Sequence, residues 1–482
     1  MIVGVDVGTS VTKAALIGRD GRSLRTAARD STLRHRPGGV VEQDLDDVIE
    51  TVAIVVRDVC AGLDEPPEAV ALTGQGDGLW LRDEHGVATR PPISWMDARA
   101  TARLDHWRTE GVVERVHSLT GSGIFPGCHA TLLAHLAEHE PESLDRAAVA
   151  GYCVDAVLQR LTGVISVDAS DASLPFLDVR RREYVEQALE ICGLSAWQHL
   201  LAAPAEPGTV FALSVEGSAV LGLPAGVPVT AGPYDLQACG FGSGARELGQ
   251  GTVVVGTTLS CQVLTADPSV PTDSAPAGMW LCTPDPQTYL RVMPSMVGTA
   301  GIAWALGLAG ARAEDLDDVL APTTIGADGL RALPFLSESG ERAPFVDPRA
   351  QGQLTGLSLS SQPADVVRAV CEAVAHAART CFETIGLDGE LSGCGGGLRS
   401  RALTQLFADV IGRPLHVPRE DQVGARGAAA VAWAALGSPV DAEAWAADRE
   451  VAHPRPEATA AYDVGHVRYL EDLEDARARW NR

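Results

Sequence analysis

The sequence predicts an α/β fold in two domains. Short runs of β-branched residues alternate with helical patterns along most of the chain, which is typical of layered α/β proteins. A length of 482 residues exceeds what one hydrophobic core usually supports. A β-rich segment at residues 252–260 repeats the strand, Gly-Thr turn and strand of residues 3–12, so two halves begin alike. We expect two related domains facing each other across a cleft, with a boundary in the glycine-rich stretch 242–249 that separates residues 1–243 from residues 244–482.

The chain opens with a predicted β-hairpin. Alternating apolar residues up to Val5 indicate a strand, residues 8–10 a tight turn, and residues 11–17 an antiparallel strand. The other expected elements are a helix over 45–63, a buried strand over 69–73, largely helical segments over 101–161 and 191–204, a helix, strand, glycine-rich turn and helix through 364–436, and a helical tail over 438–482.

The only lysine of the chain is Lys13, at the end of this hairpin turn. Backbone N–H groups, the hydroxyls of Thr9 and Ser10 and one cation suit a phosphate group, and Asp6 is placed to hold a hydrated divalent metal. The alternative is that codon bias replaced lysine by arginine and left this one by chance. A P-loop is excluded because Thr12, not glycine, precedes Lys13.

Bulk composition narrows the class of protein. Apolar residues make up 46% and charged residues 21% of the chain, as in ordinary globular enzymes. A net charge of −25 argues against nucleic acid or an anionic membrane as partner. The ten cysteines show no zinc-type spacing, and no apolar run reaches membrane-spanning length. These features indicate a reduced, cytoplasmic protein without a signal peptide.

Two later segments carry further candidate residues. Asp235 follows a predicted buried strand and a turn, where ligands bind in open α/β sheets, and its carboxylate could accept a proton from a hydroxyl nucleophile. The alternative is that Asp235 only caps the next helix. Residues 393–400, Gly-Cys-Gly-Gly-Gly-Leu-Arg-Ser, precede a helix and offer bare backbone to a flat ligand, although the motif alone is weak.

In their order along the chain, these blocks resemble the FGGY family of carbohydrate kinases over essentially the whole sequence. The matching blocks are Asp-Val-Gly-Thr-Ser at 6–10, Gly-Gln-Gly-Asp-Gly at 74–78, Ile-Ser-Trp-Met-Asp-Ala-Arg at 93–99, Gly-Pro-Tyr-Asp at 232–235, Gly-Glu-Arg-Ala-Pro at 340–344, Gly-Gly-Gly-Leu-Arg-Ser at 395–400 and Gly-Ala-Arg-Gly-Ala-Ala at 424–429.

The resemblance implies two actin-like, ribonuclease-H-like domains flanking a deep catalytic cleft that holds ATP and Mg²⁺, with a small sugar or polyol deeper. It implies that Asp6 is linked to Mg²⁺ through water and that Asp235 is the catalytic base. The implied nucleotide contacts are Asp6, Thr9, Ser10 and Lys13 in the first domain and Gly256, Thr257, Thr258, Gly298, Gly396 and Ser400 in the second. The implied substrate contacts are Gly76, Asp77, Trp95, Asp97, Arg99 and Asp235.

The implied reaction is ATP-dependent phosphorylation of a terminal hydroxyl of a small polyol or ketopentose. The Gln-Gly-Asp-Gly loop looks closer to the erythritol kinase-like branch than to the xylulokinase-like branch, and Asp77 and Asp97 could hold vicinal hydroxyls while Arg99 offsets their charge. Many relatives carry Asn or Gln where this chain has Leu236, which changes what the pocket can bind. A xylulose or ribulose kinase and a non-catalytic actin-like nucleotide sensor remain alternatives, and a homodimer is common among relatives.

Overall fold

The computed structural model describes residues 1–269 and 275–480, and the chain divides into two compact units. The first unit comprises Met1–Gly244, Thr265–Leu290 and Gln422–Ala447, and the second comprises Ala245–Leu264, Arg291–Asp421 and Asp448–Arg482. The first division falls inside the stretch where the sequence predicts a boundary. The first unit also takes in two segments that lie beyond that boundary in the sequence. None of the described helices is long and apolar enough to cross a membrane.

The first unit is built on a six-stranded sheet with the order β11-β12-β6-β1-β2-β3. The strands are β1 (Ile2–Val7), β2 (Val11–Ile17), β3 (Ser23–Asp30), β6 (Ala69–Gly74), β11 (Phe211–Ala212) and β12 (Pro228–Ala231). β1 pairs antiparallel with β2, which confirms the predicted hairpin. β1, β6 and β12 run parallel to one another, so their carboxyl ends meet at one edge of the sheet.

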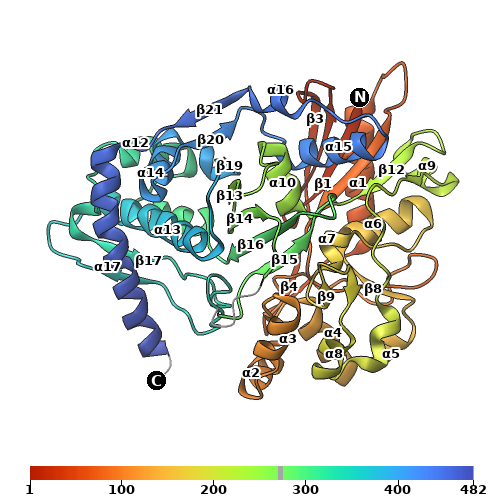
Figure 1. Ribbon diagram of the computed structural model, residues 1–482, viewed down its shortest axis with the longest axis horizontal. Helices are drawn as coiled ribbons and strands as arrows, with labels where there is room; N and C mark the ends of the chain where they lie inside the picture. The colour runs from red at the N-terminus through yellow and green to blue at the C-terminus, as the bar shows by residue number, and fades with distance from the viewer. Residues whose placement is uncertain (270–274, 481–482) are drawn as a thin grey trace. The chain divides into compact units, whose positions relative to one another are not determined.

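Helices cover both faces of this sheet. Helix α1 (Leu45–Cys60) begins at Asp44, whose side chain accepts a hydrogen bond from the Asp46 amide, and it buries its apolar side with α6 (Cys153–Thr162) on one face. Helix α15 (Val423–Ala435) buries alanines on the other face. Figure 1 shows α15, from late in the chain, beside the β-strands of the N-terminus.

The chain between β6 and β12 adds a second core to this unit. Its elements are β7 (Trp80–Arg82), α2 (Thr101–Thr109), α3 (Val112–Thr120), α4 (His129–His139), α5 (Pro141–Asp145), β8 (Val149–Gly151), α7 (Ala169–Ala172), β9 (Leu177–Asp178), β10 (Glu183–Tyr184), α8 (Glu186–Ile191) and α9 (Val215–Leu221). The prediction of a helical stretch over 191–204 is largely wrong. Helix α8 ends at Ile191, Gly193 has a φ of +72°, and only a 3-10 turn, Ser195–Leu200, follows.

The second unit repeats the strand arrangement of the first. In it the sheet runs β16-β14-β13-β19-β20-β21, with β13 (Gly251–Val255) antiparallel to β14 (Leu259–Thr265) and parallel to β19 (Leu391–Cys394). The hairpin predicted near residue 252 is therefore confirmed. The remaining elements are β16 (Tyr289–Ser295), α11 (Thr299–Leu308), α12 (Leu316–Leu320), β17 (Arg331–Leu333), β18 (Gln353–Thr355), α13 (Pro363–Ile385), α14 (Arg401–Ile411), β20 (Leu415–Pro418), β21 (Arg449–Ala452) and α17 (Pro456–Trp480).

The predicted helical tail is only partly helical. Helix α17 accounts for most of it, but β21 pairs antiparallel with β20 and extends the sheet. The edge of a sheet offers unpaired backbone groups, and this tail segment satisfies those of β20. Three short strands of the first unit are β4 (Arg34–Arg36), β5 (Val40–Glu42) and β15 (Met279–Cys282), and the short helix α16 (Ala442–Ala446) lies near the end of its last segment.

Helix α10 (Asp235–Ser243) packs against α15 with backbone touching backbone. A Cβ atom at Gly242 would lie 1.9 Å from the Val423 carbonyl oxygen, and one at Gly427 would lie 1.9 Å from the Ala238 carbonyl oxygen. On its sheet side, α15 approaches β1 so closely that a Cβ at Gly4 would lie 2.3 Å from the oxygen of Ala425. Only glycine fits these three positions without moving a main chain.

We expect Gly427→Ala to destabilise the first unit. The added methyl meets the backbone of α10, which has no flexible side chain to yield, so the free energy of unfolding should fall by about 1–3 kcal/mol. Urea unfolding measures this loss. The control is Gly307→Ala on α11, where no atom lies within 4 Å of the new methyl and helix propensity should raise stability by up to about 1 kcal/mol. Equal stability of the two variants would contradict the close packing.

Candidate active site

Three loops of the first unit lie at the common carboxyl edge of β1, β6 and β12. Residues 8–10 follow β1, residues 75–78 follow β6, and residues 232–234 follow β12. Val7 pairs with Gly74, and Leu72 pairs with Ala231, so the three strands end within a few residues of one another. In open α/β sheets ligands bind beyond the carboxyl ends of the strands. The topology therefore brings together three of the loops in which the sequence predicts functional residues.

Asp6 and Lys13 are cross-strand partners in the β1–β2 hairpin. Burial raises the pKa of Asp6, and the nearby Lys13 ammonium partly offsets that rise. A Cβ atom at Gly424, in the first turn of α15, would lie 2.9 Å from Asp6 Oδ2. The Asp6 carboxylate thus sits against the start of α15, next to the hairpin turn.

A chain of hydrogen bonds links the turn after β1, expected to bind phosphate, to the expected substrate residues. Trp95 Nε1 donates to Thr9 Oγ1 over 2.9 Å, and Thr9 Oγ1 donates to Gln75 Oε1 over 3.0 Å. Gln75 Nε2 in turn donates to Gln43 Oε1 over 3.0 Å. The hydroxyl proton of Thr9 is therefore used in the hydrogen bond to Gln75. The other hydroxyl of the turn belongs to Ser10, which is exposed.

Asp77 has an unusual backbone conformation, with a φ of +52°. Its neighbour Gly78 also has a positive φ, of +73°, and its amide donates to the Gly127 oxygen over 3.1 Å. A non-glycine residue in this region is uncommon, and such strain concentrates at ligand sites. The loop holds the Asp77 side chain in a buried position near the end of β6.

Asp97 and Arg99 form a closed ion pair. Asp97 Oδ1 accepts from the amide and Nε of Arg99, and Asp97 Oδ2 accepts from Arg99 Nη2 and from the Val41 amide, at 2.7–2.9 Å. Arg99 Nη2 also donates to Glu42 over 2.9 Å. Burial alone would raise the pKa of Glu42, but hydrogen bonds from Arg99 and Arg90 lower it overall. A carboxylate has about four acceptor positions. Those of Asp97 are filled, so in this geometry we expect Asp97 to orient Arg99 and not to hold substrate hydroxyls.

Asp235 is the first residue of α10, and residues on both sides fix the segment before it. The N-cap is Tyr234, which makes no side-chain capping bond, so Asp235 is not the N-cap residue of α10. Thr73 Oγ1 donates to the Pro233 oxygen over 2.6 Å, and the Tyr234 amide donates to Ser170 Oγ over 2.8 Å. A carboxylate in the first turn of a helix is stabilised by the helix dipole.

In the second unit the structure brings the hairpin turn 256–258 and Gly298 together. The Gly298 amide donates to the Thr257 oxygen over 3.0 Å, and a Cβ at Gly298 would lie 2.5 Å from the Gly256 oxygen. Thr299, which starts α11, donates its amide to the Gly256 oxygen over 2.7 Å. The first amides of α11 are thus engaged with the carbonyl oxygens of the hairpin turn and hold the turn against the start of the helix.

The glycine-rich turn of the second unit lies at the same sheet edge as this hairpin, since β13 and β19 run parallel. Gly396 is exposed, with no atom within 4 Å of where a Cβ would stand. The Ser400 hydroxyl caps α14 by accepting from the Leu403 amide over 3.0 Å, and it donates to Asp317. An open backbone at Gly396 suits a flat ring, while the Ser400 side chain is already engaged.

The sequence analysis missed three residues that the structure places at these loops. They are Gln75, which joins the Trp95 and Thr9 chain, Gly424, which lies against Asp6, and Asp171 of α7, whose Oδ1 would lie 2.8 Å from a Cβ at Gly76. Gln75 and Gly424 stand inside motifs that the sequence does show. Asp171 lies about a hundred residues from the loop it contacts, and nothing local marks it.

Known proteins share this architecture across the whole chain. Residues 1–242 match the N-terminal domain of the FGGY family of carbohydrate kinases, and residues 251–436 match its C-terminal domain. The chain belongs to the FGGY family of carbohydrate kinases. This carbohydrate kinase therefore has the actin-like, two-domain α/β fold of that family and uses ATP as its phosphoryl donor.

Relatives of this kinase cover nearly all of it. It is 31% identical over 458 residues to an erythritol kinase of Brucella abortus, covering 91% of this chain and 88% of the relative. It is 28% identical over 449 residues to a xylulose kinase of Escherichia coli, covering 90% and 89%. Among solved structures, a xylulose kinase from Rhodospirillum rubrum superposes with a TM-score of 0.86 at 26% identity, covering 100% of this chain and 99% of that one. A ligand-bound xylulose kinase from Lactobacillus acidophilus reaches 0.91 at 23% identity, with the same coverage, and shows the shared fold.

We expect Asp97→Asn to lower the free energy of unfolding and to leave the KM for the sugar largely unchanged. The change leaves Arg99, whose side chain is 12% exposed, without its bidentate partner, and breaking such a buried pair typically costs about 3–5 kcal/mol. Urea unfolding should show this loss. Glu138→Gln, which breaks an exposed pair with Arg103, is the control and should change stability by less than about 1 kcal/mol. A raised KM for the sugar at unchanged stability would instead place Asp97 on the substrate.

Proposed function

We propose that this kinase transfers the γ-phosphoryl group of ATP to a terminal hydroxyl of a small polyol or ketopentose, with Asp235 as general base. The observation that carries the proposal is the position of Asp235 at the start of α10, beyond the same sheet edge as the Asp77 loop and the Thr9 turn. A carboxylate there can take the proton of a hydroxyl whose oxygen attacks phosphorus.

Asp235 would orient the substrate hydroxyl and accept its proton as the new oxygen–phosphorus bond forms and the bond to the departing ADP oxygen breaks. The rigid attachment of residues 233 and 234 to Thr73 and Ser170 supports this role, because a general base acts only when held within hydrogen-bond reach. In the first unit, Lys13 and the backbone of the hairpin turn after β1 would neutralise charge on the phosphates.

Mg²⁺ would be held chiefly by the nucleotide phosphates and water. No group of three or more metal-binding side chains occurs among the residues described. Mg²⁺ commonly uses one or two carboxylates together with substrate phosphates and keeps several waters. Asp6, buried beside the hairpin turn and next to Lys13, is the residue that would hold it through water, and the ion would stabilise the charge of the transferring group.

The substrate class follows from the Asp77 loop. Asp77 supplies a buried carboxylate that accepts hydrogen bonds from hydroxyls, and the closed Asp97 and Arg99 pair leaves no free guanidinium fork for an acidic sugar. The higher identity to the erythritol kinase of B. abortus favours a four-carbon polyol, and the xylulose kinases support a ketopentose as the alternative. A non-catalytic nucleotide sensor would have no use for this loop or for Asp235.

A panel of substrates tests the reaction. We expect ADP release from Mg²⁺-ATP with erythritol or another tetritol to exceed release with pentitols, D- and L-xylulose, D- and L-ribulose and glycerol. Asp235→Asn should lower kcat by about 10²–10⁴-fold with a smaller change in ATP affinity. Near-normal turnover by Asp235→Asn would remove this residue from the role of base. Sugar-independent nucleotide binding with no turnover on any alcohol would favour the sensor.

Asp77→Asn should act on the sugar and not on ATP. Asparagine keeps the size and tolerates a positive φ, but it exchanges one acceptor oxygen for a donor, so KM for the polyol should rise about tenfold while KM for ATP stays within about twofold. Steady-state kinetics with each substrate varied in turn measures both constants. An equal rise in both KM values would mean that Asp77 shapes the site without touching the sugar.

A further inference from the structure

Asp171 lies where the substrate loop and the base segment of the first unit meet. A Cβ placed on Gly76 would lie 2.8 Å from Asp171 Oδ1 and 2.1 Å from the ring of Tyr234, so both side chains occupy the space where a side chain of residue 76 would stand. The neighbouring Ser170 accepts a hydrogen bond from the Tyr234 amide. One short helix, α7, therefore contacts both the loop that carries Asp77 and the residue before Asp235.

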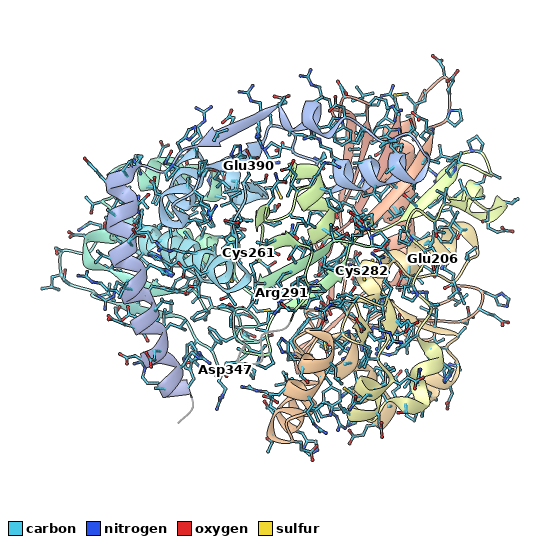
Figure 2. All side chains as sticks on the ribbon, in the orientation of Figure 1. Glu206, Cys261, Cys282, Arg291, Asp347 and Glu390 are labelled. Atoms are coloured by element: carbon cyan, nitrogen blue, oxygen red, sulfur yellow. The ribbon has the colours of Figure 1, made fainter. Side chains whose placement is uncertain are left out.

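The rest of α7 is firmly anchored. Asp168 caps the helix by accepting from the Ser170 amide over 2.9 Å, and Ser173 Oγ accepts from the Cys282 amide over 3.0 Å. Figure 2 labels Cys282, which belongs to β15 of the same unit. The backbone position of Asp171 is thus fixed by hydrogen bonds on both sides of it.

Both carboxyl oxygens of Asp171 are buried and have no hydrogen-bond partner among the residues described. An ionised carboxylate buried without donors is strongly unfavourable, so such a group takes up a proton. The charged and titratable groups around it are mostly acidic: Asp155 of α6, the α7 cap Asp168, Asp235 of α10, Asp77 of the substrate loop, and the side chains of Tyr152 and Cys153.

Within this cluster, Asp171 is the carboxyl group that is most favoured to be protonated. Burial raises the pKa of Asp171, and Asp155, Asp168, Asp235 and Asp77 raise it further. Burial also raises the pKa of Asp155, but the Arg82 guanidinium and a hydrogen bond from the Tyr152 amide counteract the rise. Among the described residues, no cation or hydrogen-bond donor stabilises a charge on Asp171. Of Asp171 and Asp155, we therefore expect Asp171 to keep its proton.

We propose that Asp171 is a positioning residue that acts as a neutral carboxylic acid, holding the Gly76–Asp77 loop against the Tyr234–Asp235 segment without placing a second negative charge beside the base. This proposal rests on the proposed function, in which Asp235 is that base. A neutral acid carries no charge that would repel the four carboxylates acting on it, those of Asp155, Asp168, Asp235 and Asp77. An ionised Asp171 would instead raise the pKa of Asp235 and favour its inactive, protonated form.

The test compares Asp171→Asn with Asp171→Ala. Asparagine is neutral, has the same shape and can donate, so kcat should stay within about threefold of wild type, and the acid limb of the kcat/KM–pH profile should not move. Alanine keeps neither the contact with Gly76 nor the donor, so kcat should fall on the order of tenfold or more. Glu186→Gln, which removes an exposed charge on α8, is the control for net charge and should leave the profile unchanged.

Two results would overturn the proposal. A shift of the acid limb to lower pH by about one unit in Asp171→Asn would show that wild-type Asp171 is ionised, because removing a like charge lowers the pKa of the base. Full activity of Asp171→Ala would show that Asp171 positions nothing. Asp235→Asn is measured in parallel: if that variant keeps its turnover, the base assignment itself fails, whereas an inactive Asp235→Asn beside a fully active Asp171→Ala overturns only the role of Asp171.

Thermal unfolding gives a readout that does not depend on turnover. A carboxyl group whose folded pKa is raised contributes stability that is complete below its unfolded pKa and is lost as pH rises towards the folded value. Asp171→Asn removes this titration. Its Tm relative to wild type should therefore increase steadily from pH 5 to pH 8, and a constant difference across that range would contradict a neutral Asp171.

Discussion

The contact of α10 with α15 is the constraint on which the active site of this kinase depends. The two helices meet through backbone atoms at Gly242 and Gly427, and α15 meets β1 in the same way at Gly4. Backbone contacts cannot be adjusted by a change of rotamer, so they fix the separation of the elements more tightly than side-chain packing does. Asp235 begins α10, and Asp6 of β1 lies against the first turn of α15. Asp235, the proposed base, and Asp6, the carboxylate proposed to hold Mg²⁺ through water, are therefore placed by one set of backbone contacts within the first unit.

Hydrogen bonds also fix the loops that follow β1, β6 and β12. Trp95, Thr9 and Gln75 form a continuous chain, so the turn after β1 and the loop after β6 are joined by hydrogen bonds. Thr73 and Ser170 hold the segment before Asp235 from two sides. A phosphoryl-transfer enzyme needs its nucleophile, base and phosphate contacts in fixed relation, since most of its catalysis is positioning and electrostatic stabilisation. Side chains that first look like ligands, such as Thr9 and Asp97, serve here largely to hold other groups in place.

The sequence predicted the hairpins, the two-domain α/β fold and the family because these depend on local patterns: alternating apolar residues, turn glycines and motif spacing. It could not predict that residues 422–447 join the first unit, since no local signal records which sheet a helix covers. The helix expected over 191–204 failed because Gly193 ends α8, a conformational choice that periodicity does not reveal. Asp171 was missed for a related reason, because its importance arises from a contact with Gly76 across the fold. The family resemblance also implied that Asp97 and Ser400 are ligand contacts, but only the folded structure shows that Asp97 already accepts and Ser400 already donates hydrogen bonds within the protein.

The first unit buries several carboxyl groups near a reaction that itself develops negative charge, so the charge of each group has to be offset. The means of offsetting it differs from one carboxyl group to the next. Asp97 is neutralised by Arg99, Asp168 is bonded to Ser170, and Asp155 faces Arg82. Asp171 has no such partner among the described residues, and for it protonation is the remaining way to avoid an unpaired buried charge. Asp155 and Asp168 therefore have partners, whereas a protonated Asp171 would add no negative charge beside Asp235, the proposed base. The acidity of the region is then compatible with the proposed polyol, because hydroxyls donate to carboxylates, and Lys13 is the cation proposed to balance charge on the transferred phosphoryl group.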